Sequence, residues 1–415
     1  MALIVQKYGG TSVGSIERIK NVAARVKAGL DQGHRMVVVL SAMAGVTNAL
    51  IALARQISPD PDPRELDVLM TTGEQQSVAL FCMAARDLGI QARSLLGFQA
   101  AILTDRMFGR ARINYIETRR IMELLDKGRL VVVAGFQGVD ENTGDVTTLG
   151  RGGSDTTAVA LAAALHADVC EIYTDVEGVF TTDPNVEPKA RKLRQITYEE
   201  MLEMASLGAK VLDIRSVALA AKFGVEVHVR STFSDREGTM VVPEAHIDEK
   251  LMVSGVAYTK NEARIKVLDV PDQPGVASRL FNPISQAGIV VDVIIQNTSA
   301  DGHTDLTFTV PRADFNRALD LVRPVAEAIG AGQVEGDTNI AKVSIIGIGM
   351  RNHAGVAARM FNTLARENIN IQTINTSEIK ISCIIDEKYT ELAVRALHDA
   401  FGLAEEIEPS QEDLA

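Results

Sequence analysis

The stretch Thr147–Leu165, TTLGRGGSDTTAVALAAAL, decides the fold. Three glycines surround Arg151, and glycine lets a backbone turn sharply and lie close to a ligand. Ser154 or Asp155 can cap a helix whose body is nearly all Ala, Val and Leu, so free N–H groups and the positive end of the helix dipole would face the glycine loop. The stretch predicts an anion site before a buried helix, although taken alone a tight turn entering a core helix is the better interpretation.

Two units upstream show the same order of strand, small-residue loop and helix. The apolar run Leu3–Val5 leads into Gln6–Gly14, QKYGGTSVG, and the buried-strand run Met36–Leu40 leads into the small and hydroxyl residues of Ser41–Asn48. Lys7 lies where the first strand is expected to end. Since ligands of open α/β sheets bind at the carboxyl ends of the strands, both loops are candidates for the same site.

A third segment contributes Glu74, close to the expected start of a helix over Leu69–Ala85, where a carboxylate suits the helix dipole. Before it, Ser58–Pro63, SPDPDP, is predicted to be an exposed loop. Further strands are expected at Leu130–Ala134, Val169–Thr174 and Val225–Val229, and helices at Glu199–Gly208 and Lys210–Gly224.

Size and composition narrow the class of protein. At 415 residues the chain fits two or three domains. With 42 Lys and Arg against 54 Asp and Glu, the net charge is −12 and no basic cluster stands out, so we expect no nucleic-acid partner. No apolar run is long enough to span a bilayer and the amino terminus lacks the features of a signal peptide, so we expect a cytoplasmic protein without membrane contact. Cys82, Cys170 and Cys383 lie too far apart for a disulfide framework or a zinc site.

Six motifs in order resemble the aspartate kinases, members of the amino acid kinase fold. They are KYGGTSVG, SAMAGVTN, TTGEQQSVAL, GRGGSDTTA, YTDVEGVFTTDP and GAKVLDIRSV. Any one of them is weak evidence, but six in this order make a chance match remote. The resemblance implies an α/β, three-layer catalytic domain with a mostly parallel central sheet, over residues 1–245.

The remaining third contains an internal repeat, since Gly275–Asn282, GVASRLFN, recurs as Gly355–Asn362, GVAARMFN. Each copy is predicted to follow a βαββα pattern, which resembles paired βαββαβ ACT domains, the small-ligand sensors of amino-acid biosynthetic enzymes. The resemblance implies that the first ACT domain, 262–340, is inserted into the second, 251–261 plus 341–405. The expected strands are Leu251–Tyr258, Ile265–Val270, Thr304–Val310, Val343–Ile348 and Ile379–Ile385.

By resemblance, the reaction is transfer of the ATP γ-phosphoryl group to the β-carboxylate of L-aspartate, the first step toward lysine, threonine and methionine. A carboxylate is already a nucleophile, so catalysis needs positioning and charge neutralisation, with Mg²⁺ bound to ATP and no protein ligand assigned to the metal. Lys7 and Asp155 are the expected catalytic residues; a helix cap is the structural alternative for Asp155. The substrate-binding residues are expected to be Ser41, Thr47, Glu74, Phe136, Arg151, Gly152 and Ser154, and the nucleotide-binding residues Lys7, Gly9, Gly10, Thr174, Asp175, Phe180, Thr182, Asp183 and Lys210.

Two positions depart from the motifs of the family. Asn185 follows Asp183-Pro184 where some relatives carry an arginine, and Asp213-Ile214 replaces a frequent His-Pro. Both departures concern detailed nucleotide contacts and leave the expected reaction unchanged.

The repeat implies control by lysine and threonine, at sites where the first ACT unit of one subunit meets the second unit of its partner. We therefore expect a homo-oligomer, with an internal start such as Met252 as a possible source of a small subunit. The candidate effector-binding residues are Asp272, Gly275, Val276, Ala277, Gln296, Asn297, Thr304, Asp305, Met350, Asn352, Val356, Asn375 and Glu378.

Two other functions stay open at this point, and a third is set aside. The first is another amino acid kinase, acting on glutamate, acetylglutamate or carbamate; the second is a non-catalytic amino-acid sensor. A dehydrogenase built on Gly347-Ile-Gly349 is disfavoured because no GxGxxG is completed.

Overall fold

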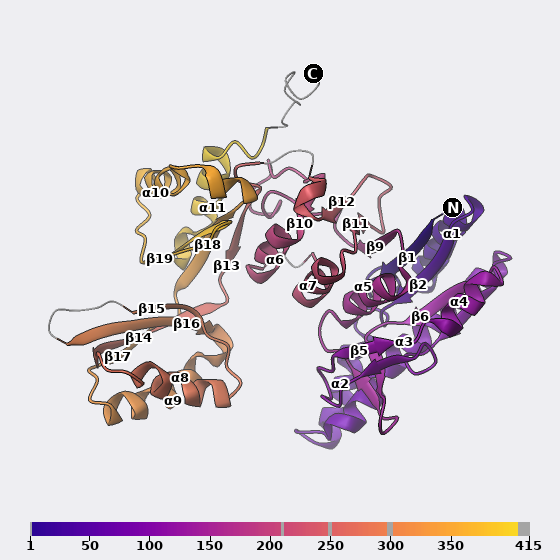
Figure 1. Ribbon diagram of the computed structural model, residues 1–415, viewed down its shortest axis with the longest axis horizontal. Coiled ribbons are helices and arrows are strands. Elements are labelled where there is room, and N and C mark those ends of the chain that lie inside the picture. Colours follow the sequence, from indigo (N-terminus) through magenta and orange to yellow (C-terminus); the bar gives the residue numbers. More distant parts are fainter. Residues whose placement is uncertain (1, 209–210, 248–250, 297–301, 406–415) are drawn as a thin grey trace. The chain divides into compact units, whose positions relative to one another are not determined.

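The computed structural model describes residues 2–208, 211–247, 251–296 and 302–405 (Figure 1). The chain divides into two compact units, Met1–Phe180 with Lys192–Lys250, and Thr181–Arg191 with Leu251–Ala415. Within the described ranges, no helix is both long and apolar enough to cross a membrane.

The first unit is built on an eight-stranded sheet in the order β10-β12-β11-β9-β1-β2-β6-β3. Its strand pairs are parallel except β11 with β12, which confirms the mostly parallel central sheet. The strands are β1 Leu3–Tyr8, β2 Arg35–Leu40, β3 Ala92–Leu95, β6 Leu130–Ala134, β9 Val169–Thr174, β10 Gln195–Thr197, β11 Val227–Ser231 and β12 Thr239–Val242.

Helices cover both faces of this sheet. Apolar residues of α1 and α3 pack with Tyr8, Val38 and Val132 on one face, while α5 packs against β1, β2 and β9 and against α7. Because side chains alternate along a strand, Lys7 points to the face opposite Tyr8, toward α5. The helices of this unit are α1 Ile16–Asp31, α2 Val46–Ile57, α3 Pro63–Asp87, α4 Arg119–Asp126, α5 Gly153–Leu165, α6 Tyr198–Ser206, α7 Ile214–Phe223 and the 3₁₀ turn Glu244–His246.

A small second sheet, which the sequence analysis did not predict, adjoins the end of β6. It has the order β5-β4-β7-β8, and β7 begins shortly after β6 ends. Its strands are only three or four residues long, too short for an alternating pattern to be recognised. They are β4 Ile102–Thr104, β5 Ile113–Ile116, β7 Gln137–Asp140 and β8 Val146–Thr148.

The second unit contains two four-stranded antiparallel sheets with helices on one side of each (Figure 1). The two modules repeat one pattern, and Gly275 and Gly355 precede their first helices with φ of 92° and 98°. The first sheet holds β14 Glu262–Pro271, β15 Asp292–Gln296, β16 His303–Pro311 and β17 Val334–Asp337, with α8 Val276–Gln286, the 3₁₀ turn Arg312–Asp314 and α9 Phe315–Ala328. The second holds β13 Gly255–Thr259, β18 Ile340–Ile346, β19 Thr373–Thr376 and β20 Lys380–Asp386, with 3₁₀ turns Ile348–Asn352 and Glu387–Tyr389, α10 Val356–Arg366 and α11 Thr390–Ala400.

The strand before the first module pairs with the second one. β13 lies antiparallel to β18, so the first module is inserted between two strands of the second sheet. β13 begins at Gly255, later than the expected start at Leu251.

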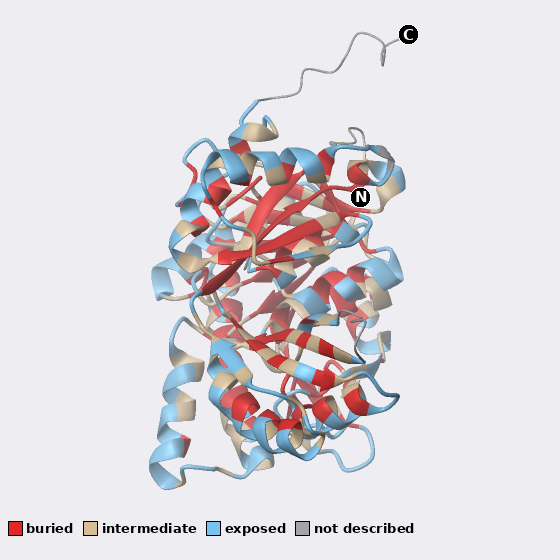
Figure 2. Cartoon of the chain, turned by 90° about the vertical axis from the view of Figure 1, so that its left-hand side faces the viewer, coloured by how far each residue is buried: buried red, intermediate tan, exposed pale blue. Residues whose placement is uncertain are grey.

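The catalytic domain expected over residues 1–245 does not include all of that range, because Thr181–Arg191 lies outside the first unit. This segment belongs to the second unit, because the Val256 amide donates to the Thr181 carbonyl at 2.7 Å and the Arg395 Nε donates to the Val186 carbonyl at 2.8 Å. Figure 2 shows the buried residues of both units concentrated on strands and on the inner sides of helices.

Two helices, α3 and α7, begin at other residues than the sequence analysis predicts. α3 begins at Pro63, capped by Asp62, which accepts from the Glu65 amide at 3.1 Å. α7 begins at Ile214, capped by Asp213, instead of at Lys210. Proline suits a first helical position because its missing N–H has no partner there in any case.

Candidate active site

A cavity of about 640 Å³ opens at the carboxyl ends of β1, β2 and β6. It brings together Lys7, Asp155 and every residue expected to bind substrate. The cavity is lined by Lys7, Gly9, Gly10, Ser41, Ala42, Met43, Ala44, Gly45, Thr47, Asn48, Ile51, Met70, Glu74, Gly109, Phe136, Gly150, Arg151, Gly152, Gly153, Ser154 and Asp155.

An ion pair between β1 and α5 forms the base of the cavity. The Nζ of Lys7 lies 2.5 Å from Oδ1 of Asp155, and only 11% and 13% of the two side chains are exposed. Two charges held this close with little water are fixed in position more firmly than a surface pair. The cavity therefore contains a lysine whose place is set before any ligand arrives.

The glycine loop differs from its expected form at the helix start. α5 begins at Gly153, and Gly152 at φ 67° takes the cap position without a side-chain cap, so neither Ser154 nor Asp155 caps the helix. A Cβ on Gly152 would lie 2.2 Å from Cγ of Asp213, which only glycine avoids. Since the first amides of a helix have no partner within it, an uncapped start leaves donors for a ligand.

The loops after β1 and β2 pack closely against each other. A Cβ on Gly10 would lie 2.8 Å from the carbonyl oxygen of Ala42, and the Ala44 amide donates to the Gly10 carbonyl at 3.1 Å. At the end of β6, a Cβ on Gly135 would lie 2.8 Å from Ser154. Three strand ends thus meet through glycines at one side of the cavity.

Glu74 lies in the middle of α3, so the expectation that it favours the helix dipole is wrong. The side chain is buried; Oε1 accepts from the Ala42 amide at 3.0 Å, and Oε2 finds no hydrogen-bond partner among the described residues. Burial raises the pKa of Glu74 to about 7. A buried carboxylate oxygen without a donor beside a cavity is suited to a cationic group.

Arg151 is exposed at the edge of the cavity, and no side chain in the described ranges pairs with its guanidinium. Its segment is held by Arg215 of α7, which donates to the Leu149 carbonyl at 2.6 Å and to the Arg151 carbonyl. Asp213 in turn caps α7 and packs on Gly152. The Asp213 departure noted above thus has a structural role, which the sequence analysis missed together with that of Arg215.

The expected nucleotide-binding residues divide between the two units. Thr174 ends β9 and its hydroxyl donates to Asp175 at 3.1 Å, and Phe180 forms a bridge with Lys192. In the second unit, Asp183 accepts from the Tyr258 hydroxyl at 3.3 Å, and the Thr182 hydroxyl is buried without a partner in the described part of the chain. Lys210 lies outside the described residues.

The effector candidates of the first ACT module lie at the start of α8 and on β15 and β16. Asp272 and Gln296 are exposed, Ala277 is half-buried, and Val276 and Thr304 are buried. Asp305 forms an ion pair with Lys266 at 2.8 Å, which lowers the pKa of Asp305. Asn297 lies outside the described residues.

The candidates of the second module lie in the 3₁₀ turn Ile348–Asn352, at the start of α10, on β19 and just after β19. Met350 and Val356 are buried, and Asn375 is half-buried on β19. Glu378 lies 3.5 Å from Arg351. The side chain of Asn352 is not described.

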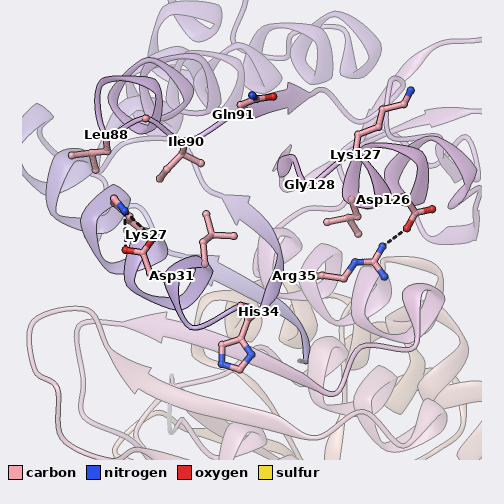
Figure 3. Close-up of a pocket in the computed structure, with 14 residues that line it drawn as sticks. Lys27, Asp31, His34, Arg35, Leu88, Ile90, Gln91, Asp126, Lys127 and Gly128 are labelled. Atoms are coloured by element: carbon pink, nitrogen blue, oxygen red, sulfur yellow. Dashed lines mark hydrogen bonds and ion pairs between the residues drawn. The ribbon is translucent and has the colours of Figure 1, made fainter.

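A second hollow, of about 730 Å³, lies at the amino ends of β2, β3 and β6 (Figure 3). Its charged groups include two pairs, Lys27 with Asp31 at 2.8 Å and Arg35 with Asp126 at 2.6 Å. Ligands of open α/β sheets bind at the opposite edge. The cavity containing Lys7 is therefore the candidate active site, although it is the smaller of the two.

Comparison with known proteins gives matches over nearly the whole chain. Residues 2–231 match the Amino acid kinase family and residues 269–323 and 343–401 match the ACT domain. The chain is 58% identical over 404 residues to an aspartate kinase of Stutzerimonas stutzeri, covering 97% of this chain and 98% of that protein. It is 50% identical over 408 residues to an aspartokinase of Mycolicibacterium smegmatis, covering 97% of each chain.

The chain belongs to the aspartate kinases. Among solved structures, Escherichia coli aspartokinase III in complex with aspartate and ADP matches this aspartate kinase with a TM-score of 0.79 at 28% identity, over 96% of this chain and 99% of that one. The aspartate kinase of Synechocystis matches at 45% identity with a TM-score of 0.54, over 98% of this chain and 70% of that one. The expected family and fold class are confirmed.

The glycines of the dehydrogenase alternative have packing roles in this aspartate kinase. A Cβ on Gly347 would lie 2.5 Å from the Met252 carbonyl oxygen, and one on Gly349 would lie 2.4 Å from that of Leu251. Both positions need glycine because another part of the backbone passes close by.

Proposed function

We propose that this aspartate kinase transfers the γ-phosphoryl group of ATP to the β-carboxylate of L-aspartate, giving aspartyl-4-phosphate at the entry to lysine, threonine and methionine synthesis. The observation that supports this most directly is the cavity that holds the Lys7–Asp155 pair together with a Glu74 oxygen and an Arg151 guanidinium that have no partner among the residues with described positions. These groups match the charges of an amino acid and a phosphoryl donor.

Lys7 acts on the transferring phosphoryl group. The acceptor carboxylate is ionised at neutral pH and needs no general base, so the protein must hold the reactants in line and neutralise charge that spreads over the phosphoryl oxygens. Lys7 supplies that positive charge with the amides of Gly9 and Gly10, and Asp155 holds its ammonium in place at 2.5 Å.

Glu74 and Arg151, which both line the cavity, recognise the two charged groups on the α-carbon of aspartate. The Oε2 of Glu74 receives the α-ammonium group, since an acceptor without a donor is available there. Arg151 receives the α-carboxylate with its planar pair of donors. The rest of the acceptor site is formed by Ser41, Thr47, Phe136, Gly152 and Ser154.

Thr174, Asp175, Phe180, Thr182, Asp183 and Lys210 contact the nucleotide in this proposal. The motif match to the family supports it, as does the similarity to Escherichia coli aspartokinase III, a structure with aspartate and ADP. Mg²⁺ enters as part of the Mg·ATP substrate. Among the described residues no group of three or more His, Cys, Asp or Glu is arranged to hold a metal ion, so we assign it no protein ligand.

The test is ADP release by the purified chain with L-aspartate, L-glutamate, acetylglutamate or carbamate as acceptor. Aspartate should give the highest kcat/KM by far. A preference for another acceptor would make the chain a different amino acid kinase, and ADP release with none of them would favour a non-catalytic sensor.

Lysine and threonine are the proposed effectors, and the chain is proposed to act in the cytoplasm as a homo-oligomer joined through its ACT modules. Escherichia coli aspartokinase III has been solved with lysine and aspartate, which supports the first effector. The edge strands β15 and β19 expose Ile294 and Ile374 by 55% and 45%, as expected of surfaces that meet another subunit. A small subunit starting near Met252 is part of the same proposal, and molar mass in solution with and without effectors tests it.

Effector binding should depend on Asp272 and on Thr307, which lies on β16. Asp272→Ala removes a carboxylate beside the start of α8, and Thr307→Ile adds bulk to the strand. Because allosteric coupling is typically about 1 to 3 kcal/mol, we expect the half-inhibitory concentration of lysine or threonine to rise by about tenfold or more while uninhibited kcat stays the same. Titrating both effectors singly and together provides the measurement; unchanged inhibition in both variants would remove this region from the effector site.

A further inference from the structure

Asp67 is a fully buried carboxylate on the side of α3 that carries Glu74 two helical turns later. It accepts from three donors outside its own helix. The Gly109 amide lies 3.1 and 2.9 Å from its two oxygens, the Thr148 amide lies 2.8 Å from Oδ2, and the Thr148 hydroxyl lies 2.7 Å from Oδ1. Asp67 does not line the cavity.

One donor, the Gly109 amide, belongs to the wall of the cavity, and the other two belong to Thr148, three residues before Arg151. Thr148 ends β8 and is followed by Leu149, Gly150 and Arg151. Gly109 lines the cavity, and its carbonyl oxygen would lie 2.7 Å from a Cβ on Gly150. The Ala111 amide also donates to the Thr148 carbonyl at 2.8 Å. One carboxylate therefore fastens two adjoining segments of the wall to α3.

We infer that Asp67 is a positioning residue, which sets the distance between Arg151 and Glu74 by holding the start of the glycine loop on α3. The inference rests on the proposed function, in which those two residues receive the α-carboxylate and the α-ammonium of aspartate. An apolar residue could fill the same space, but it would leave the Gly109 amide and the Thr148 amide and hydroxyl without their acceptor. Burial raises the pKa of Asp67, against the lowering effect of these same donors.

Asp140 of β7 provides a matched control. It is also buried and accepts from three donors, the Asn142 amide at 3.2 Å and the Thr143 amide and hydroxyl at 2.8 Å. It is not among the residues that line the cavity, and its donors lie in the β7–β8 turn. Losing its bonds should lower stability without moving Arg151.

The experiment compares Asp67→Ala with Asp140→Ala by thermal midpoint, kcat, and KM for aspartate and for ATP. Both variants should melt earlier. Because a displacement of about 1 Å can cost about a hundredfold in rate, Asp67→Ala should lower kcat/KM for aspartate by about ten- to a hundredfold with KM for ATP within about twofold, and Asp140→Ala should change neither KM. Equal KM values for aspartate in the two variants would overturn the inference.

Two further variants separate positioning from folding. Asp67→Asn should bring the KM for aspartate most of the way back to the wild-type value. Its amide oxygen can replace Oδ2, and its NH₂ can donate to the Thr148 hydroxyl once that hydroxyl rotates. If Asp67→Ala does not fold, Thr148→Val removes a single donor and should raise the aspartate KM about threefold to tenfold; no rise would contradict the inference.

A double variant tests whether Asp67 affects aspartate binding through Arg151. If Asp67 acts through Arg151, Asp67→Ala should add little to the aspartate KM in an Arg151→Ala background. Full additivity would overturn the stated route. Wild-type protein that does not phosphorylate aspartate would refute the proposed function itself, whereas active wild type with an unaffected Asp67→Ala variant would refute only this inference.

Discussion

Replacing Asp155 with asparagine, or Lys7 with methionine, should lower kcat by a thousandfold or more. Each change removes one member of the pair at the base of the cavity, where Nζ and Oδ1 lie 2.5 Å apart with little exposure to water. Losing one preorganised electrostatic contact to a transition state costs about a hundred- to a thousandfold, and a buried charge left without its partner is displaced as well. Single-turnover and steady-state ADP release provide the measurement.

Stability must be measured beside turnover, because a single change leaves a poorly solvated charge. Each single variant should lose about 3 kcal/mol of unfolding free energy, and the double variant Lys7→Met/Asp155→Asn should regain part of it. Turnover should stay low in the double variant. This separates a catalytic effect from a folding effect. If the double variant regains stability but not turnover, the loss of turnover comes from the missing catalytic groups.

The exposed pair Lys27–Asp31 on α1 provides the control, with 40% and 62% of the side chains exposed. Lys27→Met and Asp31→Asn remove the same kinds of charge far from the cavity, and surface pairs of this kind contribute about 0 to 1 kcal/mol. Their kcat should match wild type. Near-normal turnover in either Lys7→Met or Asp155→Asn would show that the catalytic assignment is wrong.

The sequence indicated the main sheet because its strands are uninterrupted apolar runs. β6 and β9 have the bounds expected from the sequence alone, since strands buried on both faces need no alternating pattern. The duplicated Gly-Val-Ala stretch indicated the two ACT modules for a similar reason, because a glycine with φ near 95° must precede each helix. Both features depend on residues that are close together in the sequence, so a sequence pattern can predict them.

The parts that were missed depend on partners distant in the sequence. Asp67 lies before the helix expected from Leu69, and nothing near it in the sequence indicates that Gly109 and Thr148 will donate to it. The same holds for Arg215, whose acceptors lie at Leu149 and Arg151. Such residues are found only when the fold has brought the segments together.

Helix starts were missed for a different reason. The expected start of α3 ignored Asp62-Pro63, a cap and first helical residue that the sequence did display. The error moved Glu74 from the middle of the helix to its start, and so attributed it to the helix dipole. Its burial is what determines its chemistry.

Glu74→Gln should raise KM for aspartate by about a hundredfold and leave KM for ATP unchanged. The Oε2 of Glu74 is buried without a donor in the described residues, so the α-ammonium of aspartate gains a charge-assisted hydrogen bond that an amide cannot replace. Acceptors without an α-amino group should be affected much less. Equal losses with both kinds of acceptor would contradict the ammonium contact.

The pH dependence of wild-type kcat/KM should reveal the same carboxylate. Burial raises the pKa of Glu74 to about 7, and only the ionised form pairs with an ammonium group. Below pH 7, kcat/KM for aspartate should therefore fall about tenfold per pH unit. The Gln variant should lack this slope, and a slope that persists in the variant would assign it to another group.

The same carboxylate should make the protein less stable as pH rises when no aspartate is present. The pKa of Glu74 is about 7 in the folded chain against an ordinary value of 4.5, so the unfolded chain releases its proton first and gains free energy over that interval. Between pH 5 and pH 8 the difference amounts to about 2 to 3 kcal/mol. Relative to wild type, Glu74→Gln should gain that amount over this range in chemical denaturation without aspartate. If the two proteins kept a constant difference in unfolding free energy from pH 5 to pH 8, the carboxylate would have to be ionised throughout, and the empty site would not hold the desolvated oxygen on which the recognition of aspartate depends.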